Sequence, residues 1–233
     1  MSCDQLTGDA AVRPKVAVVD DSSLTREAFQ LVYPALDVLG SFASVNAFLA
    51  HKLPVDMIVL DLMLSPTLED CVLQGPRATE ELTAQGYKVC VYTDERRLLV
   101  LAQCFSAGAR GLVRKIDPIS DNQAAFLKVA AGQIVVPHSM VGMAELLSRR
   151  KSLPTLTPRQ TEVLGARARG ESWDGLSRRL GIAAKTAQDH FDAVMSKMVL
   201  FLQETGLNPS SSPADIERAL GLTPGDLNDP RGF

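Results

Sequence analysis

Long apolar segments are the first thing that this sequence lacks. None of its hydrophobic runs approaches 18 residues, although 46% of the 233 residues are hydrophobic and 22% are charged. The first 14 residues are polar. We therefore expect neither a membrane-spanning helix nor a signal peptide. The length and composition are typical of two folded domains in a cytoplasmic protein.

Cysteine pairs with metal-ligand spacing are also absent, and no internal repeat is visible. The chain has four cysteines, and two of them, Cys90 and Cys104, lie in apolar runs. A buried thiol in such a run acts as a small hydrophobic side chain. The spacing therefore predicts neither a zinc site nor a redox pair.

A strong net charge is missing too, because the formal charge is only −3. The charge is unevenly distributed, however. Residues 149–200 contain ten Lys and Arg against five Asp and Glu, a surplus of five positive charges. Basic character confined to one segment favours a nucleic-acid partner for that segment.

Short runs rich in Val, Ile and Leu alternate with helical patterns between residues 15 and 131. The expected strands are Lys15–Val19, Val38–Ala43, Met57–Leu60, Val89–Tyr92 and Gly111–Arg114. The expected helices are Ser23–Tyr33, Val45–His51, Arg77–Gln85, Glu95–Ala107 and Asp121–Ala131. Strict alternation predicts an α/β domain, a doubly wound five-stranded parallel sheet that helices cover on both faces.

Polar residues follow four of these strands. Asp20 and Asp21 come after the first strand, Asp61 after the third, Thr93 after the fourth and Lys115 after the fifth. Parallel strands in an open sheet direct their carboxyl ends to one crevice, so these side chains should converge. Clustered carboxylates repel one another and attract a divalent cation, while a lysine and a hydroxyl suit phosphoryl oxygens.

The region after residue 131 has a different pattern. A break at residues 132–137 precedes one amphipathic connecting helix over 139–150. Thr157, Pro158 and Gln160 then form a strong helix start signal, with a cap, a first-turn proline and a capping box. Three helices are expected at Pro158–Arg169, Trp173–Leu180 and Lys185–Phe201. Short helices joined by tight turns predict an all-α helix-turn-helix domain.

The expected organisation is thus a domain at 14–131, a linker with its connecting helix at 132–153, a helix-turn-helix domain at 154–202 and a C-terminal extension at 203–233. In the extension we predict one short helix, Ala214–Leu220, and otherwise a segment that is mobile or packs late.

The polar strand ends make the first domain similar to the receiver domain of two-component response regulators. The matching residues are the acidic pair Asp20 and Asp21, the phosphoacceptor Asp61, the switch hydroxyl Thr93, Lys115, and Gly75 in the turn after the phosphorylation loop. The resemblance implies a flavodoxin-like fold and Mg²⁺-dependent phosphoryl transfer from a sensor histidine kinase. It also implies a metal site of Asp20, Asp21, Asp61 and the main-chain carbonyl of Met63.

Two features depart from the receiver pattern. The position three residues before Lys115 is usually aromatic in the family, and here it is Leu112. The segment between Asp61 and Gly75 is longer than usual, and it carries Pro66, Glu69, Asp70 and Cys71. The first departure questions the usual relay from the switch hydroxyl, and the second adds an acidic loop beside the metal site.

Residues 156–199 resemble the LuxR-type helix-turn-helix of NarL/FixJ-class regulators. The resemblance is carried by residues 156–159, 162–164, Gly170, Ser172, 180–182, Lys185, Thr186, His190 and Lys197. It implies that the last helix enters the major groove of double-stranded DNA. Lys185 and Thr186 would then hold phosphates, while Gln188, Asp189 and Asp192 would face the bases.

That helix has features that oppose tight DNA binding. Asp189 and Asp192 repel phosphates, and Ala183 stands where the family usually has a serine cap. Gly175 likewise replaces the usual acid in the capping box of the preceding helix. We therefore expect binding as a dimer, formed by the phosphorylated protein through its fourth-helix face, because two joined half-sites raise the effective affinity.

The leading interpretation is a phosphorylation-controlled transcription regulator, not an enzyme in the ordinary sense. One alternative is a signalling adaptor or heterodimer partner with a degenerate DNA-binding domain, which Ala183, Asp189 and Asp192 favour. Another is a regulator whose receiver is controlled without phosphorylation, which Leu112 and the long loop favour. A phosphatase with an aspartyl nucleophile is disfavoured, because Met63 stands where its second acid would be.

Overall fold

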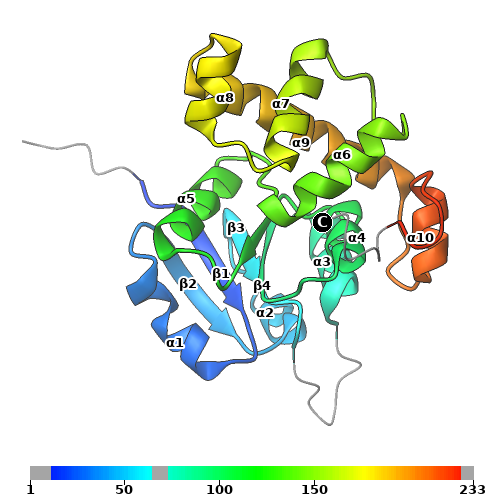
Figure 1. The fold of residues 1–233 in the computed structure, drawn as a ribbon. Coiled ribbons are helices and arrows are strands. Elements are labelled where there is room, and N and C mark those ends of the chain that lie inside the picture. Colours follow the sequence, from blue (N-terminus) through cyan, green and yellow to red (C-terminus); the bar gives the residue numbers. More distant parts are fainter. Residues whose placement is uncertain (1–11, 65–72, 227–233) are drawn as a thin grey trace, which may run out of the picture.

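The computed structural model describes residues 12–64 and 73–226. Its five strands form one parallel sheet in the order β2-β1-β3-β4-β5 (Figure 1). The strands are β1 (Lys15–Val19), β2 (Asp37–Phe42), β3 (Met57–Leu60), β4 (Val89–Thr93) and β5 (Gly111–Arg114). The expected doubly wound sheet is therefore confirmed, with small shifts at β2 and β4. Strand order reverses between β1 and β3, which leaves a crevice at their carboxyl ends.

Alternate residues of each strand enter different cores, because successive side chains of a strand point to opposite faces. Val16 and Val18 pack with Phe29 and Phe126, from helices α1 (Ser23–Val32) and α5 (Ile119–Ala130). Ala17 and Val19 belong to the other core. That second face is covered by α2 (Val45–His51), α3 (Gly75–Ala84) and α4 (Leu98–Ser106).

Helix α4 begins later than the sequence pattern indicates. The periodic pattern predicts a start at Glu95, but the helix begins at Leu98. The Glu95 carboxylate accepts the main-chain N–H groups of Arg96 and Arg97, each at 2.8 Å. The side chain thus holds the two residues before the helix in a turn, which is a local competition with helical structure that periodicity does not report.

Gly111 lets α5 approach the sheet. A Cβ atom at this position would lie 2.3 Å from Val129 Cγ2 and 3.1 Å from Cys90 Sγ. Both neighbours are buried, and no side chain larger than hydrogen fits without moving the helix. The glycine therefore sets the packing distance between β5 and α5.

The remaining helices follow the sheet in the chain. Those of residues 158–205 form the lobe at the top of Figure 1, which we call the upper lobe. In chain order, the remaining helices are η1 (His138–Met140), α6 (Val141–Arg149), α7 (Pro158–Ala168), α8 (Trp173–Leu180), α9 (Ala184–Thr205) and α10 (Pro213–Ala219). The predicted capping box is present at Thr157, whose hydroxyl accepts the N–H of Gln160 while the Gln160 amide accepts the N–H of Thr157. Gly181 ends α8 in the left-handed conformation, which forms the tight turn before α9.

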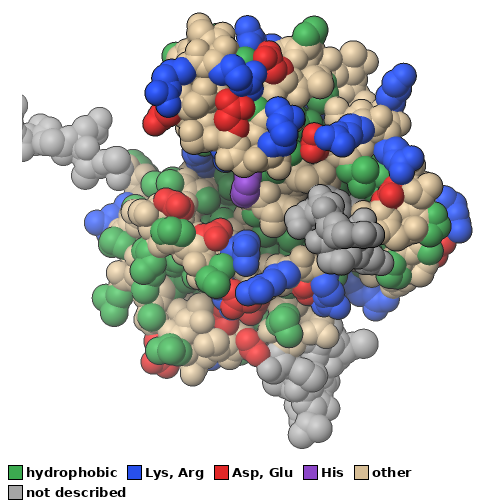
Figure 2. Space-filling model, in the orientation of Figure 1, with side chains coloured by type: hydrophobic (Ala, Val, Ile, Leu, Met, Phe, Trp, Pro, Cys, Tyr) green, Lys and Arg blue, Asp and Glu red, His purple; other side chains and the backbone are tan. Residues whose placement is uncertain are grey.

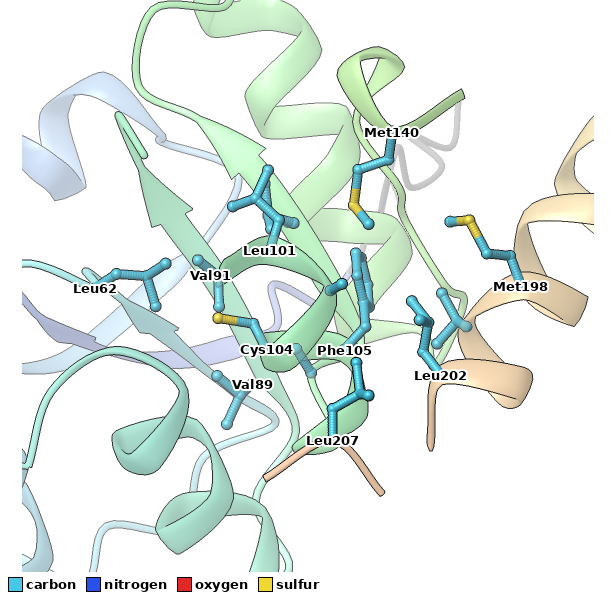
Figure 3. Close-up of a cluster of buried hydrophobic side chains, with 14 of the residues drawn as sticks. Leu62, Val89, Val91, Leu101, Cys104, Phe105, Met140, Met198, Leu202 and Leu207 are labelled. Atoms are coloured by element: carbon cyan, nitrogen blue, oxygen red, sulfur yellow. The ribbon is translucent and has the colours of Figure 1, made fainter. Parts of the chain in front are cut away.

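One hydrophobic core continues from the sheet into the upper lobe. Phe105 of α4 lies among Met140, Met198, Leu202 and Leu207 (Figure 3). Helix α9 therefore packs against the outer side of α4 with its C-terminal half. The fourth-helix face, through which we expect the active dimer to form, is covered in this arrangement.

The C-terminal extension is packed as far as it is described, to residue 226, where the sequence predicted a segment that is mobile or packs late. Its predicted helix is present as α10, one residue earlier than expected. Leu207, Ile216, Leu220 and Leu222 are buried in the same core as α4 and α9. Their apolar spacing was too short to show periodicity, so only tertiary structure reveals the contact. Within residues 12–64 and 73–226, no helix has the length and apolar character needed to cross a membrane.

Candidate functional site

Three carboxylates meet at the carboxyl ends of the strands, as the sequence predicts. Oxygen atoms of Asp20, Asp21 and Asp61 lie within 4.8 Å of one another. Asp20 and Asp61 are buried, and Asp21 is half-buried. Main-chain bonds fix the first and third, because Asp61 N–H donates to Val19 O at 2.8 Å and Asp20 N–H donates to Phe42 O at 3.1 Å. The oxygen-rich donor set fits a hard divalent cation.

Lys115 joins the cluster from the end of β5. Its Nζ lies 2.8 Å from Asp20 Oδ2 and 2.9 Å from Asp61 Oδ2. Burial raises the pKa of Asp20, and Lys115 offsets only part of that effect. Burial alone would lower the pKa of Lys115, but its bonds to the two carboxylates outweigh it and raise the pKa. The lysine therefore stays charged between two buried acids.

The loop after β1 is held by residues that the sequence analysis did not single out. The Arg26 guanidinium donates to the main-chain oxygens of Asp20 and Asp21, at 2.6 and 2.8 Å. Ser22 N–H donates to Asp20 Oδ1 at 2.8 Å. These bonds fix the direction of the acidic pair. Sequence offers a weak signal for Arg26 only, since a helix starting at Ser23 places it one turn from the pair.

Thr93 lies at the end of β4 and is fully buried. Its hydroxyl accepts the N–H of Glu95 at 3.2 Å, and its carbonyl accepts the N–H of Lys115 at 3.1 Å. The hydroxyl is thus connected to the start of α4 rather than to Asp61. Leu112 is buried on the α4 side of the sheet, in the core that contains Phe105.

An aromatic residue does stand beside the lysine, although not at the position of Leu112. The Lys115 Nζ lies 5.6 Å from the ring centroid of Tyr92. The Tyr92 hydroxyl is 3.0 Å from that of Tyr33, on the α1 and α5 side of the sheet. The sequence analysis missed this contact because it required an aromatic residue on β5.

Helix α9 carries all five residues predicted to face DNA, in its first three turns. Lys185, Thr186, Asp189 and Asp192 are exposed, and Gln188 is half-buried. Lys185 Nζ pairs with Asp189 Oδ1 at 2.6 Å, so the acid neutralises the nearest cation. The Ala183 side chain makes no cap bond. Ser172 caps α8 through the N–H of Gly175, but that glycine has no side chain to complete a capping box.

The pKa of Asp192 is also affected by a charge on the domain that contains the sheet. Burial raises its pKa, and the charge of Lys128 on α5 is the largest influence in the opposite direction. The upper lobe carries many Lys and Arg side chains with acids between them (Figure 2). Several of these cations are paired, including Arg159 with Glu162, and Arg179 with both Glu162 and Glu171.

Comparison with known families identifies the second lobe. Residues 154–200 match the family model of the luxR family of bacterial regulatory proteins. Two curated relatives extend the similarity to most of the chain. One is "Probable transcriptional regulatory protein SgaR" of Hyphomicrobium methylovorum, 26% identical over 193 residues, which are 81% of this chain and 88% of the relative. The other is the response regulator protein VraR of Staphylococcus aureus, 27% identical over 193 residues (79% and 90%).

Residues 154–200 therefore form a LuxR-type helix-turn-helix domain, and most of the chain is similar to response regulators. Solved structures agree in fold. RcsB of Salmonella enterica serovar Typhimurium, bound to a promoter in the presence of phosphomimetic BeF3⁻, has a TM-score of 0.51 at 19% identity, covering 83% of this chain and 97% of that one. A two-component response regulator RcsB–DNA complex has a TM-score of 0.50 at 18% identity (84% and 100%).

The structure brings together some of the predicted site residues and not others. Asp20, Asp21, Asp61 and Lys115 come together, whereas the Thr93 hydroxyl bonds elsewhere. Met63 follows Asp61 in the chain, and its N–H lies 3.4 Å from Asp61 Oδ1. Most of the long loop after Asp61, with Pro66, Glu69, Asp70 and Cys71, lies outside the described residues.

Proposed function

We propose that this response regulator accepts a phosphoryl group on Asp61 and thereby controls the binding of its LuxR-type domain to DNA. The proposal depends above all on one observation, the convergence of Asp20, Asp21, Asp61 and Lys115 at the switch point of the sheet. Such a crevice is where open α/β sheets bind their ligands. Four charged groups so close together, three of them acidic, favour a phosphoryl and cation site over a structural role.

The chemistry follows from the nucleophile. A carboxylate oxygen of Asp61 attacks phosphorus in a phosphohistidine or a small acyl phosphate, and a P–O bond forms. The P–N or P–O bond to the donor breaks, and its electron pair leaves with the donor's nitrogen or oxygen. Asp21, Asp61 and the Met63 carbonyl would hold Mg²⁺ directly, and Asp20 through water. When bound, Mg²⁺ supplies positive charge that neutralises the phosphoryl oxygens.

Lys115 and Thr93 supply the remaining contacts. Lys115 already touches the acceptor carboxylate, so it can bind a phosphoryl oxygen after little movement. Thr93 must leave its bond with the N–H of Glu95 before its hydroxyl can donate to another phosphoryl oxygen. That exchange loosens the turn before α4, since the same Glu95 binds the N–H groups of Arg96 and Arg97 there. A local bond change can thereby favour a second conformation.

A sensor histidine kinase is the partner that this surface fits. Leu24 follows β1, Met63 follows β3, and Ile116 and Ile119 follow β5. All four side chains are more than half exposed, and the topology places them at the edge of the sheet that contains Asp61. An exposed apolar rim around an acidic centre suits docking of a protein donor.

The output would be sequence-specific DNA binding by α9, in a dimer of the active protein. Lys185 and Thr186 lie at the first turn, where major-groove helices contact DNA, and Gln188, Asp189 and Asp192 follow on the next turns. The pairing of Lys185 with Asp189 reduces the charge available for phosphates. Dimerisation compensates, because two tethered half-sites act together.

Phosphorylation control is tested by gel shifts of the wild type and Asp61→Asn, each with and without acetyl phosphate and Mg²⁺. The probe is a duplex that the activated wild type selects from a random-sequence pool. We expect acetyl phosphate to tighten wild-type binding about tenfold, a typical coupling between sites, and to leave Asp61→Asn unchanged. Equal tightening in both proteins would overturn phosphorylation at Asp61.

The role of α9 is tested by Asp189→Lys. The change breaks the pair with Lys185 and adds one positive charge, so non-specific DNA binding should tighten and its dependence on salt should become steeper by about one counterion. The measurement is the affinity for a mixed-sequence duplex at several salt concentrations between about 50 and 200 mM, from which the slope is obtained. Asp215→Lys, which changes an exposed acid outside α9, is the matched control. An identical slope in all three proteins would mean that α9 does not meet DNA.

The same ion pair favours a second candidate function, an adaptor whose helix-turn-helix binds another protein. In that case no treatment, including acetyl phosphate or Asp189→Lys, would produce a gel shift.

A further inference from the structure

The C-terminal extension is the part of this chain that neither the LuxR family match nor the phosphorylation site accounts for. The family match ends at residue 200, and α9 ends at Thr205. Gly206 then takes the left-handed conformation and turns the chain back toward the receiver. In Figure 1 the extension, in orange and red, lies beside α3 and α4.

The first contact is with the main chain of residues 207 and 208. Ser106 Oγ accepts the N–H of Leu207 at 2.7 Å, and Gln103 Nε2 donates to Asn208 O at 2.9 Å. Both partners belong to α4, and Gln103 is itself buried. The Leu207 side chain enters the core beside Phe105 (Figure 3). Two polar side chains thus bind an extended segment while its leucine fills an apolar space.

Further contacts continue along the extension. Arg77 of α3 donates to Ser210 Oγ across a groove of about 580 Å³. Ile216 of α10 and Leu220 just after it are buried in the same core, and Leu222 follows them. Beyond α10, Asp226 pairs with Arg150 at 3.1 Å, just after α6. The extension therefore touches the receiver and the linker at once.

Helix α4 explains why such a cover is needed. Seven of its nine residues are apolar, the exceptions being Gln103 and Ser106, and Leu101 to Phe105 are all buried. A helix with so few polar residues is stable only when most of its surface is covered. Release of α9 would uncover this surface, which makes it suitable for a second copy of the chain.

We propose that the α3–α4 surface is a receptor for residues 206–222 of the same chain, and that this strap holds α9 on the receiver. While the strap is docked, α9 and α4 remain packed and the α4 surface is closed to a second copy. The consequence for DNA binding rests on the proposed function, since it assumes that α9 must leave α4 to act. The strap thus sets how readily α9 separates from α4.

The test uses the full chain with Gln103→Ala and Ser106→Ala together, which remove the two polar contacts and leave the apolar ones. Amide hydrogen exchange is measured by mass spectrometry in residues 194–222, without a phosphodonor. We expect exchange in the C-terminal half of α9 and in the strap to rise together by about tenfold, as loss of two hydrogen bonds predicts. Arg218→Ala is the control, since this side chain and its partner Asp215 are both exposed and neither contacts α4.

Two results would overturn the strap. In the first, exchange rises in residues 206–222 alone, which means that the extension peels off without affecting α9. In the second, neither segment changes in the double variant. Ile216→Ser guards against a merely local effect, because it weakens the strap from its other end and should give the same joint response.

Gel shifts of the same variants separate this inference from the proposed function. If the strap restrains DNA binding, the double variant should bind the selected duplex several-fold more tightly without acetyl phosphate. Unchanged binding in a protein that does respond to acetyl phosphate overturns that restraint. Absence of any gel shift with acetyl phosphate contradicts the proposed function instead, and the exchange result still decides the strap.

Discussion

Replacing Lys115 with methionine should lower the free energy of unfolding by about 3–5 kcal/mol, the usual cost of removing one partner of a buried ion pair. The ammonium lies within 3 Å of two buried carboxylates, and a third is close by. Three carboxylates and one lysine carry a charge of −2, and the substitution makes it −3. Within the described residues no other cation forms an ion pair with Asp20 or Asp61, so their repulsion is left uncompensated.

Urea denaturation measures this effect, and Lys88→Met is the matched control. Lys88 is exposed and donates only to a main-chain oxygen, so its loss should cost little. Mg²⁺ should restore part of the stability of Lys115→Met, because it binds the folded cluster and not the unfolded chain. Phosphoryl transfer from acetyl phosphate should remain about 100-fold slower, since no positioned donor replaces Nζ. A stability equal to that of Lys88→Met would contradict the charge balance proposed for the site.

The acidic site was predictable because it depends on a rule of topology. Alternating patterns define parallel strands, and parallel strands bring their carboxyl ends together, so Asp20, Asp61 and Lys115 could be placed from sequence alone. The ends of β1 and β3 were equally accessible, since Val16–Val19 and Met57–Leu60 are apolar and an acid follows each of them. Capping at Thr157 also followed from local residue chemistry.

The contacts that sequence could not predict are of two kinds: local bonds to main-chain groups and apolar contacts between distant segments. Arg26 binds main-chain oxygens, and every residue has one, so the identity of the neighbouring residues does not reveal the contact. The bond from Glu95 to the Thr93 hydroxyl looks in sequence like the start of a helix. Leu207 and Leu220 lie in segments too short for a periodic pattern, and their burial depends on the position of α9. Expectations therefore failed at tertiary contacts and at one helix start, where the bonds of Glu95 replace the expected first turn.

Phe105→Ala should show that the two lobes fold as one unit. The ring is fully buried between the sheet and α9, where it contacts a core that includes Met198 and Leu202. Truncating a buried phenylalanine to alanine typically costs about 3–5 kcal/mol, from lost burial and from the cavity left behind. Here the cavity would lie at the junction, so the stability of α9 against α4 should fall most.

The chain's one tryptophan, Trp173 on α8, makes the effect measurable. Its fluorescence reports the upper lobe, while far-ultraviolet circular dichroism reports the whole chain. In urea the two signals should change together in the wild type and separately in Phe105→Ala, because coincident probes indicate one cooperative transition. Phe126→Ala is the control, since that ring is equally buried on the α5 side, away from α9. It should lower stability by a similar amount and keep the probes coincident. Separate transitions in the wild type, or coincident ones in Phe105→Ala, would show that α4 does not couple the lobes.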